Sequence, residues 1–244
     1  MNALVVGGSN GIGLSLVLSL VGRDDVSIVY VVDKQPFLSE YSCDKVVFFQ
    51  CDLSQIADLS MFDEMQDVGY LYITVGFGKL CPFASLDLTH IDSSFAVNTV
   101  APIKIIKAFY DKMLGVKSFN CAVMVSIAGH LSSPLFSIYS ATKAALSKFI
   151  EAVNIELEMS GSYNRILEVS PGSLKGTSFT GGVSQPELTA DLASEIIERS
   201  IRKETLFIPQ YDEVFKNVLK RYNDDPHKFG VESYVYKMER MGKI

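Results

Sequence analysis

Short apolar runs rich in β-branched residues alternate along this chain with longer runs of helical periodicity, and this alternation constrains the fold more than any other feature. We expect strands at residues 3–6, 27–32, 45–50, 70–75, 121–126, 166–170 and 206–208. We expect helices at residues 11–21, 55–65, 91–114, 139–159, 189–202 and 213–222. Continuous apolar strands separated by helices are typical of a parallel sheet covered on both faces. The sequence therefore predicts an α/β fold with a doubly wound central sheet of about seven parallel strands.

The chain is long enough to build one such domain. Its 244 residues are 48% hydrophobic, which allows a large buried core. No repeat, low-complexity segment or Pro/Gly/Ser-rich linker divides it. We expect residues 1–222 to form a single domain and residues 223–244 to form a C-terminal extension.

The charge and the cysteine content argue against several classes of partner. The formal net charge is −6 and lysines and arginines do not cluster, so we expect neither nucleic acid nor a membrane surface as a partner. Cys43, Cys51, Cys81 and Cys121 are scattered, without a Cys-x-x-Cys pair, and only three histidines are present, which argues against a metal site and against disulfides. No apolar run reaches the roughly 18 residues of a membrane span. We expect a cytoplasmic protein with reduced thiols.

A glycine-rich turn, GGSNGIG, lies between the first expected strand and the first expected helix. Gly7 permits a tight turn, Gly11 lets the backbone approach a pyrophosphate, and Gly13 lets the helix pack close to the strand. The helix that follows supplies free N–H donors and a positive dipole end, which suit a phosphate group. The candidates for cofactor binding in this turn are Gly7, Ser9, Asn10, Gly11, Ile12 and Gly13. The pattern is typical of a Rossmann-type dinucleotide-binding domain.

An acidic residue, Asp33, ends the second expected strand twenty residues after Gly13. A carboxylate at this distance can accept hydrogen bonds from the ribose 2′-hydroxyl of a dinucleotide and would repel a 2′-phosphate. NAD(H) is therefore favoured over NADP(H), although Lys34 has the reach to approach a phosphate. Asp52 and Leu53, after the third expected strand, are candidates to meet the adenine, and Asp52 could equally cap the helix that follows.

The pattern Tyr-x-x-x-Lys occurs three times, starting at Tyr30, Tyr41 and Tyr139. The first pair lies on an expected strand, where four residues span about 13 Å, and the second lies in an expected loop. Tyr139 and Lys143, in YSATK, lie on an expected helix, where side chains four residues apart share one face at about 6 Å. This third pair is the credible candidate for chemistry, although its spacing is also that of an ordinary contact on a helix surface.

Three further motifs accompany YSATK: GGSNGIG, Asn98 in FAVNTVAP, and Ser126 in VMVSIAGH. With them, residues 2–210 resemble the compact branch of the short-chain dehydrogenase/reductase family. The resemblance implies that Tyr139 is the catalytic acid/base, that Lys143 activates it and anchors the ribose, and that Ser126 orients the substrate. It implies that Asn98 perturbs its helix and holds a water for proton relay. The implied activity is an NAD(P)(H)-dependent interconversion of a secondary alcohol and a carbonyl.

These residue types suit proton transfer on their own chemistry. A free phenol has a pKa of about 10, and each unit by which that pKa is lowered requires about 1.4 kcal/mol of preferential stabilisation of the phenolate. The ammonium of Lys143 and the charge of an oxidised nicotinamide both supply such stabilisation. Tyr139 would then take a proton from an alcohol or give one to a carbonyl, and no metal is needed because the cofactor carries the hydride.

Three positions depart from the family pattern. Val6 stands where the family has a threonine, and the sequence ITVG at residues 73–76 stands where the family has Asn-Asn-Ala-Gly. Thr74 is a candidate to tether neighbouring strands in place of an asparagine. Thr177 lies one position later than the threonine that contacts the nicotinamide amide, and Ser173 could compensate. The further cofactor-binding candidates implied by the resemblance are Thr74, Val75, Gly76, Tyr139, Lys143, Pro171, Gly172, Ser173 and Thr177.

The C-terminal extension is expected to cover the active site or a subunit interface. Only about eleven residues lie between the shifted threonine and the helix expected at 189, where relatives carry a longer substrate lid. We expect the extension to complete the site through Phe229, Tyr234 or Tyr236. His130 and Cys81 are expected on loops at the same edge of the sheet, where we interpret them as structural rather than as pocket lining.

Surplus apolar surface on the helical segments 98–114 and 139–159 favours a homodimer or a homotetramer. Two other functions compete with the oxidoreductase. A non-catalytic dinucleotide sensor or regulatory subunit is favoured by the altered ITVG and the shifted threonine, but it would not require Ser126, Tyr139 and Lys143 together. A sugar-nucleotide epimerase or dehydratase is disfavoured by the glycine spacing and by the absence of a sizeable C-terminal substrate domain.

Overall fold

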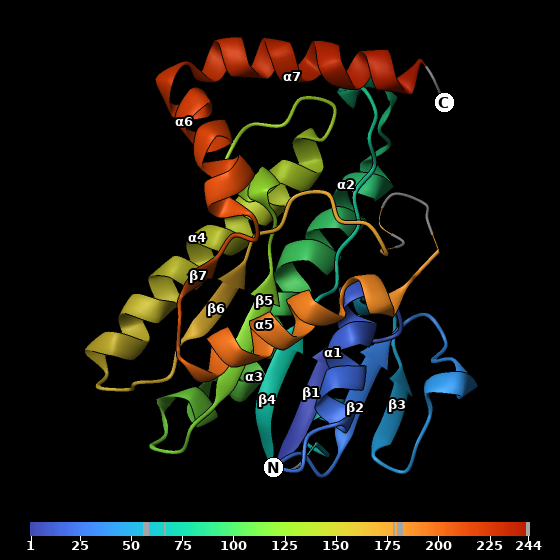
Figure 1. Cartoon of the computed structure of the whole chain (residues 1–244), viewed down its shortest axis with the longest axis vertical. Coiled ribbons are helices and arrows are strands. Elements are labelled where there is room, and N and C mark those ends of the chain that lie inside the picture. Colours follow the sequence, from blue (N-terminus) through green and yellow to red (C-terminus); the bar gives the residue numbers. More distant parts are fainter. Residues whose placement is uncertain (56–58, 66, 178, 180–182, 243–244) are drawn as a thin grey trace.

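Seven parallel strands form one central sheet in the computed structural model of the protein, which describes residues 1–55, 59–65, 67–177, 179 and 183–242. The strands are β1 (Asn2–Val6), β2 (Val29–Asp33), β3 (Val46–Gln50), β4 (Val68–Ile73), β5 (Asn120–Met124), β6 (Ile166–Val169) and β7 (Leu206–Phe207). Their order across the sheet is β3-β2-β1-β4-β5-β6-β7, and every pairing is parallel (Figure 1). The predicted α/β fold with about seven parallel strands is confirmed.

Helices cover both faces of this sheet. The α-helices are α1 (Gly11–Val21), α2 (Leu88–Phe95), α3 (Ala101–Leu114), α4 (Ser137–Met159), α5 (Ala190–Ile201), α6 (Lys216–Asp224) and α7 (Pro226–Met241), of which α1, α3, α4 and α5 pack on the sheet. In β1, Ala3 and Val5 pack in one core with α1 and α5, whereas Leu4 and Val6 pack in the other with α3 and α4. Because the central strands are buried on both faces, their residues form continuous apolar runs rather than an alternating pattern.

The strand order changes direction at β1. The chain runs outward from β1 to β2 and β3, and then returns to β4 on the other side of β1. A crevice forms beyond the carboxyl ends of the strands at such a switch point, because the connections leave it in opposite directions. Val6, the last residue of β1, pairs with Val32 of β2 and Ile73 of β4. The turns that follow these three strands therefore lie side by side.

The helix expected at 91–114 is not uniform. α2 and α3 are joined without a break by a π-helical segment, Ala96–Val100, which contains Asn98. Segments of this kind widen a helix locally and are frequent at functional sites. The observed distortion agrees with the one that the resemblance implied for Asn98.

The α-helix expected at 55–65 is wrong for the described residues of that range. Two 3-10 turns, Leu53–Gln55 and Ser60–Phe62, include some of them, residues 59 and 63–65 are not helical, and residues 56–58 lie outside the described part of the chain. The Asp52 carboxylate accepts a hydrogen bond from the backbone N–H of Ser54 at 2.9 Å. This local bond favours a turn over a regular helix at the point where the chain leaves β3.

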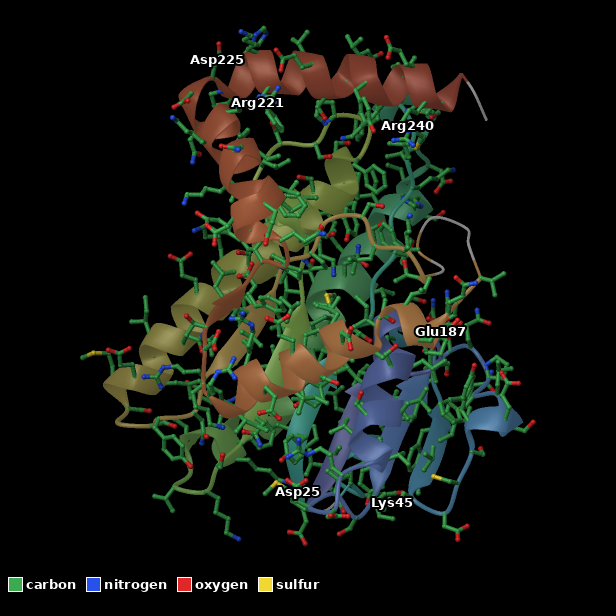
Figure 2. The ribbon with its side chains drawn as sticks, in the orientation of Figure 1. Asp25, Lys45, Glu187, Arg221, Asp225 and Arg240 are labelled. Carbon is green, nitrogen blue, oxygen red and sulfur yellow. The ribbon has the colours of Figure 1, made fainter. Side chains whose placement is uncertain are left out.

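The last two helices leave the sheet. Asp225 separates α6 from α7, and its carboxylate accepts a hydrogen bond of 2.9 Å from the backbone N–H of Lys228, which caps α7. Arg221 of α6 and Glu232 of α7 form an ion pair at 2.6 Å. In Figures 1 and 2, α7 lies across the end of the molecule opposite to the N-terminus. The domain end expected at residue 222 thus falls inside α6. Neither α7 nor another helix in the described part of the chain is long and apolar enough to cross a membrane.

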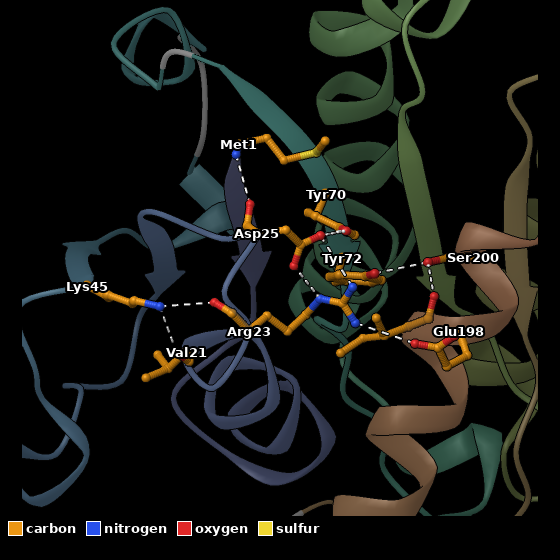
Figure 3. Close-up of polar contacts among 10 residues, drawn as sticks. Met1, Val21, Arg23, Asp25, Lys45, Tyr70, Tyr72, Glu198 and Ser200 are labelled. Atoms are coloured by element: carbon orange, nitrogen blue, oxygen red, sulfur yellow. Dashed lines mark hydrogen bonds and ion pairs between the residues drawn. The ribbon is translucent and has the colours of Figure 1, made fainter.

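A polar network holds the opposite end of the molecule, where the strands begin (Figure 3). Asp25 receives hydrogen bonds from Arg23 at 2.8 Å and from the hydroxyl of Tyr70 at 2.6 Å, and these bonds lower its pKa to about 2. Arg23 also lies 3.4 Å from Glu198 of α5, and the amino group of Met1 donates to the backbone carbonyl of Asp25 at 2.9 Å. The network joins α5 and β4 to the turn after α1, and we interpret it as structural.

Candidate active site

A cleft of about 610 Å³ opens where the turns after strands β1 to β6 meet. The predicted site residues that line it are Gly7, Asn10, Gly11, Ile12, Gly13, Asp33, Lys34, Asp52, Leu53, Thr74, Val75, Gly76, Ser126, Tyr139, Pro171, Gly172, Ser173 and Thr177. Ser9, Asn98 and Lys143 are not among the described lining residues and lie behind the wall. The structure thus gathers the predicted residues at one place.

The glycine turn makes contacts that only glycine allows. A Cβ on Gly13 would lie 2.0 Å from the carbonyl oxygen of Gly7, so the first turn of α1 packs directly on the turn. Gly7 has a φ of +87° and Gly11 a φ of +51°, in the left-handed region that favours glycine. The backbone N–H of Gly11 donates to the hydroxyl of Ser184 at 2.8 Å, so a phosphate oxygen would have to replace this hydroxyl. Close approach and N–H donors are the two properties that a pyrophosphate requires.

Backbone donors hold the carboxylate of Asp33 in the cleft. Its Oδ2 accepts from the N–H of Ser9 at 3.0 Å, and its Oδ1 accepts from the N–H of Gln35 at 2.9 Å. Ser9 therefore positions the carboxylate, and its own hydroxyl donates to the carbonyl of Gln35 at 3.0 Å. Each carboxylate oxygen retains a lone pair that can accept from a ribose hydroxyl. Lys34 lines the cleft next to it.

Asp52 and Leu53 follow β3 at the same edge of the sheet. The hydrogen bond from the backbone N–H of Ser54 lowers the pKa of the Asp52 carboxyl. Asp52 therefore caps a turn, as one interpretation of the sequence expected, and it also lines the cleft. Leu53 is buried and gives the cleft an apolar wall at this point.

Thr74 joins the glycine turn to the end of β4. Its hydroxyl oxygen lies 3.0 Å from the carbonyl oxygens of both Val6 and Gly7, within donating distance of each. A Cβ on Gly13 would lie 2.6 Å from the same hydroxyl oxygen. The tether that was expected in place of an asparagine is therefore present, and the departure at ITVG preserves the contact between neighbouring strands.

Asn98 connects the loop after β4 to α4. Its Oδ1 accepts from the N–H of Phe77 at 3.0 Å, and its Nδ2 donates to the carbonyl of Phe77 at 2.9 Å and to the hydroxyl of Thr142 at 3.1 Å. Thr142 in turn donates to the backbone carbonyl of Tyr139 at 2.7 Å. The fully buried amide thus fixes the first turn of α4, on which Tyr139 lies.

Ser126 and Tyr139 both lie on the wall of the cleft. Burial raises the pKa of Tyr139, and the neighbouring hydroxyl of Ser126 offsets only part of that increase. The hydroxyl of Ser126 also accepts a hydrogen bond of 3.2 Å from the backbone N–H of Ala128, which holds it in place after β5. A phenol and an alcohol hydroxyl side by side can hold one substrate oxygen and exchange a proton with it.

Lys143 lies one helical turn after Tyr139 and is 2% exposed. Its Nζ donates to the carbonyl of Met124 at 2.8 Å and lies 5.9 Å from the centre of the Tyr139 ring. A Cβ on Gly76 would lie 3.0 Å from Nζ, so the backbone after β4 passes directly over the amine. Burial lowers the pKa of Lys143 to about 7. The expected lowering of the Tyr139 pKa by this amine is absent from the protein alone, because burial also favours the neutral amine.

The segment after β6 forms another wall of the cleft. The hydroxyl of Thr177 donates to the carbonyl of Leu174 at 3.2 Å. A Cβ on Gly11 would lie 3.5 Å from Thr177, so this residue reaches the glycine turn despite its shift by one position. A Cβ on Gly172 would lie 2.3 Å from the ring of Phe215, which supports the segment from behind.

Comparison with protein families decides the identity of this fold. The model of the family described as short chain dehydrogenase matches residues 1–188, a range that includes the glycine turn, Ser126, Tyr139 and Lys143. The chain belongs to the short chain dehydrogenase family.

Individual relatives of this short chain dehydrogenase are distant. An uncharacterized oxidoreductase of Saccharomyces cerevisiae is 22% identical over 205 residues, which is 80% of this chain but only 66% of the yeast protein. A short chain dehydrogenase/reductase from Burkholderia phymatum, solved in complex with NAD, has a TM-score of 0.78 at 17% identity and covers 91% of this chain and 92% of its own. One from Burkholderia cenocepacia, solved in complex with NADP, has a TM-score of 0.74 at 19% identity and covers 95% and 96%. The two structures share the fold.

The short chain dehydrogenase cleft has an aromatic and basic wall that the sequence analysis missed. Ser133, Phe136, Phe179 and Lys237 line it together with Tyr139. The ring centres of Phe136 and Phe179 lie 5.3 Å and 5.2 Å from that of Tyr139. The spacing of Phe136, three residues before Tyr139, is a signal that could have revealed this contact. No sequence signal pointed to Lys237, which lies far along the chain on α7.

The aromatic residues expected to complete the site from the C-terminal extension do not contact the cleft. Phe229 packs against Tyr222 of α6, with ring centres 5.7 Å apart, and Tyr234 and Tyr236 are exposed. None of the three aromatic candidates is among the described residues that line the cleft. α7 reaches the cleft through Lys237 instead.

His130 and Cys81 are likewise not among the described lining residues. The Nε2 atom of His130 lies 2.8 Å from Glu168 and 2.9 Å from the hydroxyl of Ser170, inside the end of the sheet. Burial alone would raise the pKa of Glu168, but the hydrogen bonds from His130 and from two serines lower it further than burial raises it. In the described part of the chain, no group of three or more His, Cys, Asp or Glu side chains could hold a metal ion.

Proposed function

We propose that this chain is an NAD(P)(H)-dependent oxidoreductase that interconverts a secondary alcohol and a carbonyl by hydride transfer. The observation that carries the proposal is that the hydroxyl-bearing Ser126 and Tyr139 line the same cleft as the glycine turn and Asp33. A site that only bound a dinucleotide would not require a phenol at this place. Membership of the short chain dehydrogenase family supports the same reaction.

The residues of the cleft suit a nicotinamide dinucleotide. The glycine turn offers close approach and N–H donors to a pyrophosphate, and Asp33 offers acceptors to a ribose hydroxyl. Leu53 offers an apolar surface to the adenine. The two solved relatives hold NAD and NADP respectively, so the fold accommodates both forms. We favour NAD(H), because Asp33 would repel a 2′-phosphate, and Lys34 is the residue to replace in testing the opposite preference.

Tyr139 would move the proton while Ser126 holds the substrate oxygen. When bound, the dinucleotide accepts or supplies the hydride, and its oxidised ring brings a positive charge. Burial keeps the phenol of Tyr139 protonated in the protein alone, in the state that donates to a carbonyl oxygen. Taking a proton from an alcohol requires an ionised phenol, which a positive charge near the phenol favours.

Lys143 and Asn98 would support this group from behind the wall. The ammonium of Lys143 has three donors, one of which is engaged by Met124, and the others remain for a ribose hydroxyl. The side-chain amide of Asn98 is engaged with Phe77 and Thr142. A relay water would therefore bind the backbone carbonyl of Asn98, within the π-helical segment, rather than the amide.

The proposal is tested by cofactor binding and turnover in matched variants. Binding of NADH and NADPH is followed by fluorescence, and a panel of secondary alcohols and ketones is assayed with wild type, Tyr139→Phe and Tyr41→Phe. Tyr41 begins another Tyr-x-x-x-Lys pair but lies in the surface turn Ser39–Tyr41, so its variant controls for loss of a phenol as such. We expect loss of turnover of at least 100-fold in Tyr139→Phe alone, with dinucleotide binding retained.

Tight dinucleotide binding without turnover of any panel member, and without a difference between wild type and Tyr139→Phe, would favour the sensor instead. Failure to bind either dinucleotide would overturn the cofactor assignment as well.

We also propose that the protein forms a homodimer or a homotetramer. Ile155 and Met159 on α4 are 58% and 82% exposed, and Leu114 at the end of α3 is 41% exposed. Apolar side chains on two long helices suit a helix-to-helix contact between copies. Light scattering of wild type and of Met159→Glu measures the mass, which should fall toward that of the monomer in the variant. We place the protein in the cytoplasm, where free thiols such as Cys43 stay reduced.

A further inference from the structure

The C-terminal helix delivers a single basic side chain to the substrate end of the cleft. α7 lies across the end of the molecule toward which the strands lead, between Asp225 and Arg240 in Figure 2. Lys237, near the end of α7, lines the cleft together with Ser133, Phe136 and Tyr139. No residue from α6 or from the rest of α7 is among the described lining residues.

The position of the Lys237 ammonium is fixed. Its Nζ donates to the hydroxyl of Ser133 at 2.6 Å and to the carbonyl of Pro134 at 2.9 Å. Nζ lies 5.9 Å from the centre of the Phe136 ring, whose own centre lies 5.3 Å from that of Tyr139. A lysine has three N–H donors, so one remains after these two bonds. One aromatic ring separates this donor from the reacting phenol.

The charge of Lys237 has no protein counter-ion in the described part of the chain. The other basic residues of this region are paired or exposed: Arg221 lies 2.6 Å from Glu232, and Lys228 points to solvent. For Lys237, both hydrogen-bond acceptors are neutral. Burial lowers the pKa of Lys237 to about 8, and no described carboxylate raises it. A partly buried cation without an acidic partner is costly unless a ligand supplies the negative charge.

We propose that Lys237 binds an acidic group of the substrate, and that this enzyme therefore acts on an oxo acid or hydroxy acid, with a carboxylate or phosphate a few bonds from the reacting carbon. The proposal rests on the oxidoreductase function proposed above and adds the substrate class. The rings of Phe136 and Phe179 would pack on the carbon chain between the reacting oxygen and the acid, while the third N–H of Lys237 would donate to an acid oxygen.

A purely structural role for Lys237 makes a different prediction. If its two bonds only fastened α7 to the loop at Ser133 and Pro134, replacing it would affect all substrates alike. An anion-binding role affects acidic substrates and spares neutral ones of the same shape. The comparison of matched acidic and neutral compounds therefore separates the two roles.

The experiment compares wild type with Lys237→Gln, Lys237→Arg and Lys228→Gln. Lys228→Gln removes the same charge from an exposed position on the same helix and serves as the matched control. The probes are 4-oxopentanoate and its methyl ester, and dihydroxyacetone phosphate and dihydroxyacetone. Each is assayed for reduction with NADH and, independently of turnover, for binding by calorimetry. The carboxylate pair and the phosphate pair show which acid is preferred.

We expect wild type to prefer one acid to its neutral partner, and Lys237→Gln to lose about tenfold or more in kcat/KM and in affinity for that acid alone. Lys237→Arg should recover part of the loss, and Lys228→Gln should behave as wild type. Turnover of the neutral ketones that depends on Tyr139, without any preference for acids, would overturn the proposal and leave the oxidoreductase function intact. Binding of an acid that is lost in Lys237→Gln, without turnover of any probe, would support the anion site and contradict the oxidoreductase function. Equal effects of Lys237→Gln on both members of each pair would reduce Lys237 to a structural role.

Discussion

Replacing the buried Lys143 by methionine should change how the stability of the protein depends on pH. Lys143 is 2% exposed, and burial lowers the pKa of its amine from 10.5 to about 7. Between these two pH values Lys143 is protonated in the unfolded chain but only partly protonated in the folded protein. The free energy of unfolding of wild type therefore rises with pH in this window, relative to a variant that lacks the amine.

The size of the effect follows from the shift. Each unit corresponds to about 1.4 kcal/mol, so the charge on Lys143 destabilises the fold by on the order of 4 kcal/mol at pH 7 and about 2 kcal/mol at pH 9. Lys143→Met also loses the hydrogen bond to Met124, at a cost of about 1 kcal/mol that does not depend on pH. The excess stability of the variant over wild type should thus shrink by roughly 2 kcal/mol between pH 7 and pH 9.

Urea unfolding at the two pH values, monitored by circular dichroism, measures this difference. Lys148→Met, on the same helix, is the control, because the Lys148 ammonium is exposed and paired with Glu151 at 2.5 Å. The difference in the free energy of unfolding between Lys148→Met and wild type should be the same at pH 7 and at pH 9. If the difference in the free energy of unfolding between Lys143→Met and wild type were also the same at both pH values, the amine of Lys143 would have an ordinary pKa, and burial would not lower it.

Two further predictions concern the walls of the cleft, and a third concerns Glu168, which lies 2.8 Å from His130. Gly13→Ala should destabilise the protein by about 2 kcal/mol or more, because its Cβ would lie 2.0 Å from the carbonyl oxygen of Gly7. In the same urea titration the control Gly22→Ala should be near neutral, because the atom nearest to its Cβ would lie 3.6 Å away. Thr74→Val should lose about 1 kcal/mol of stability and weaken NADH binding in a fluorescence titration, and unchanged binding would remove the tether from the cofactor site. The pKa of Glu168 is lowered in the fold, so its carboxylate stabilises the protein above pH 4.5, and this contribution is lost as the pH falls. The difference in the free energy of unfolding between wild type and Glu168→Gln should therefore narrow on acidification. A difference that stays constant with pH would contradict the lowered pKa.

The sheet and the first half of the site could be predicted because local sequence and tertiary structure agree there. Strands buried on both faces read as continuous apolar runs, and the turns after β1, β2 and β4 must meet at one switch point. Gly7 and Asp33 were located by their position at the end of a strand, and Thr74 by comparison of ITVG with the family motif, so none of them needed knowledge of long-range contacts. The same reasoning explains why YSATK could be separated from the two other Tyr-x-x-x-Lys pairs, since only this one lies on an α-helix.

The directions in which side chains point, and the groups that they contact, could not be predicted in this way. Ser9 was expected to face the cofactor, but its N–H turns to the carboxylate of Asp33, a contact made across a loop. Lys143 was expected to act on the phenol through its charge, but burial lowers the pKa of the amine itself. Both outcomes depend on the desolvation and geometry of the assembled site, which residue spacing does not contain.

The family model matches residues 1–188 and leaves the C-terminal tail unmatched, and this division of the chain has a physical basis. The hydride and proton chemistry that we propose would use Ser126, Tyr139 and the glycine turn, and these residues are positioned by strands and helices within residues 1–188, which match the family model. Lys237 lies outside that range on a helix that touches the cleft through two hydrogen bonds to one loop. Such a helix can change its sequence without disturbing the sheet, because few core contacts depend on it. On the two proposals made above, the choice of substrate is free to vary at α7 while the chemistry stays fixed by the core.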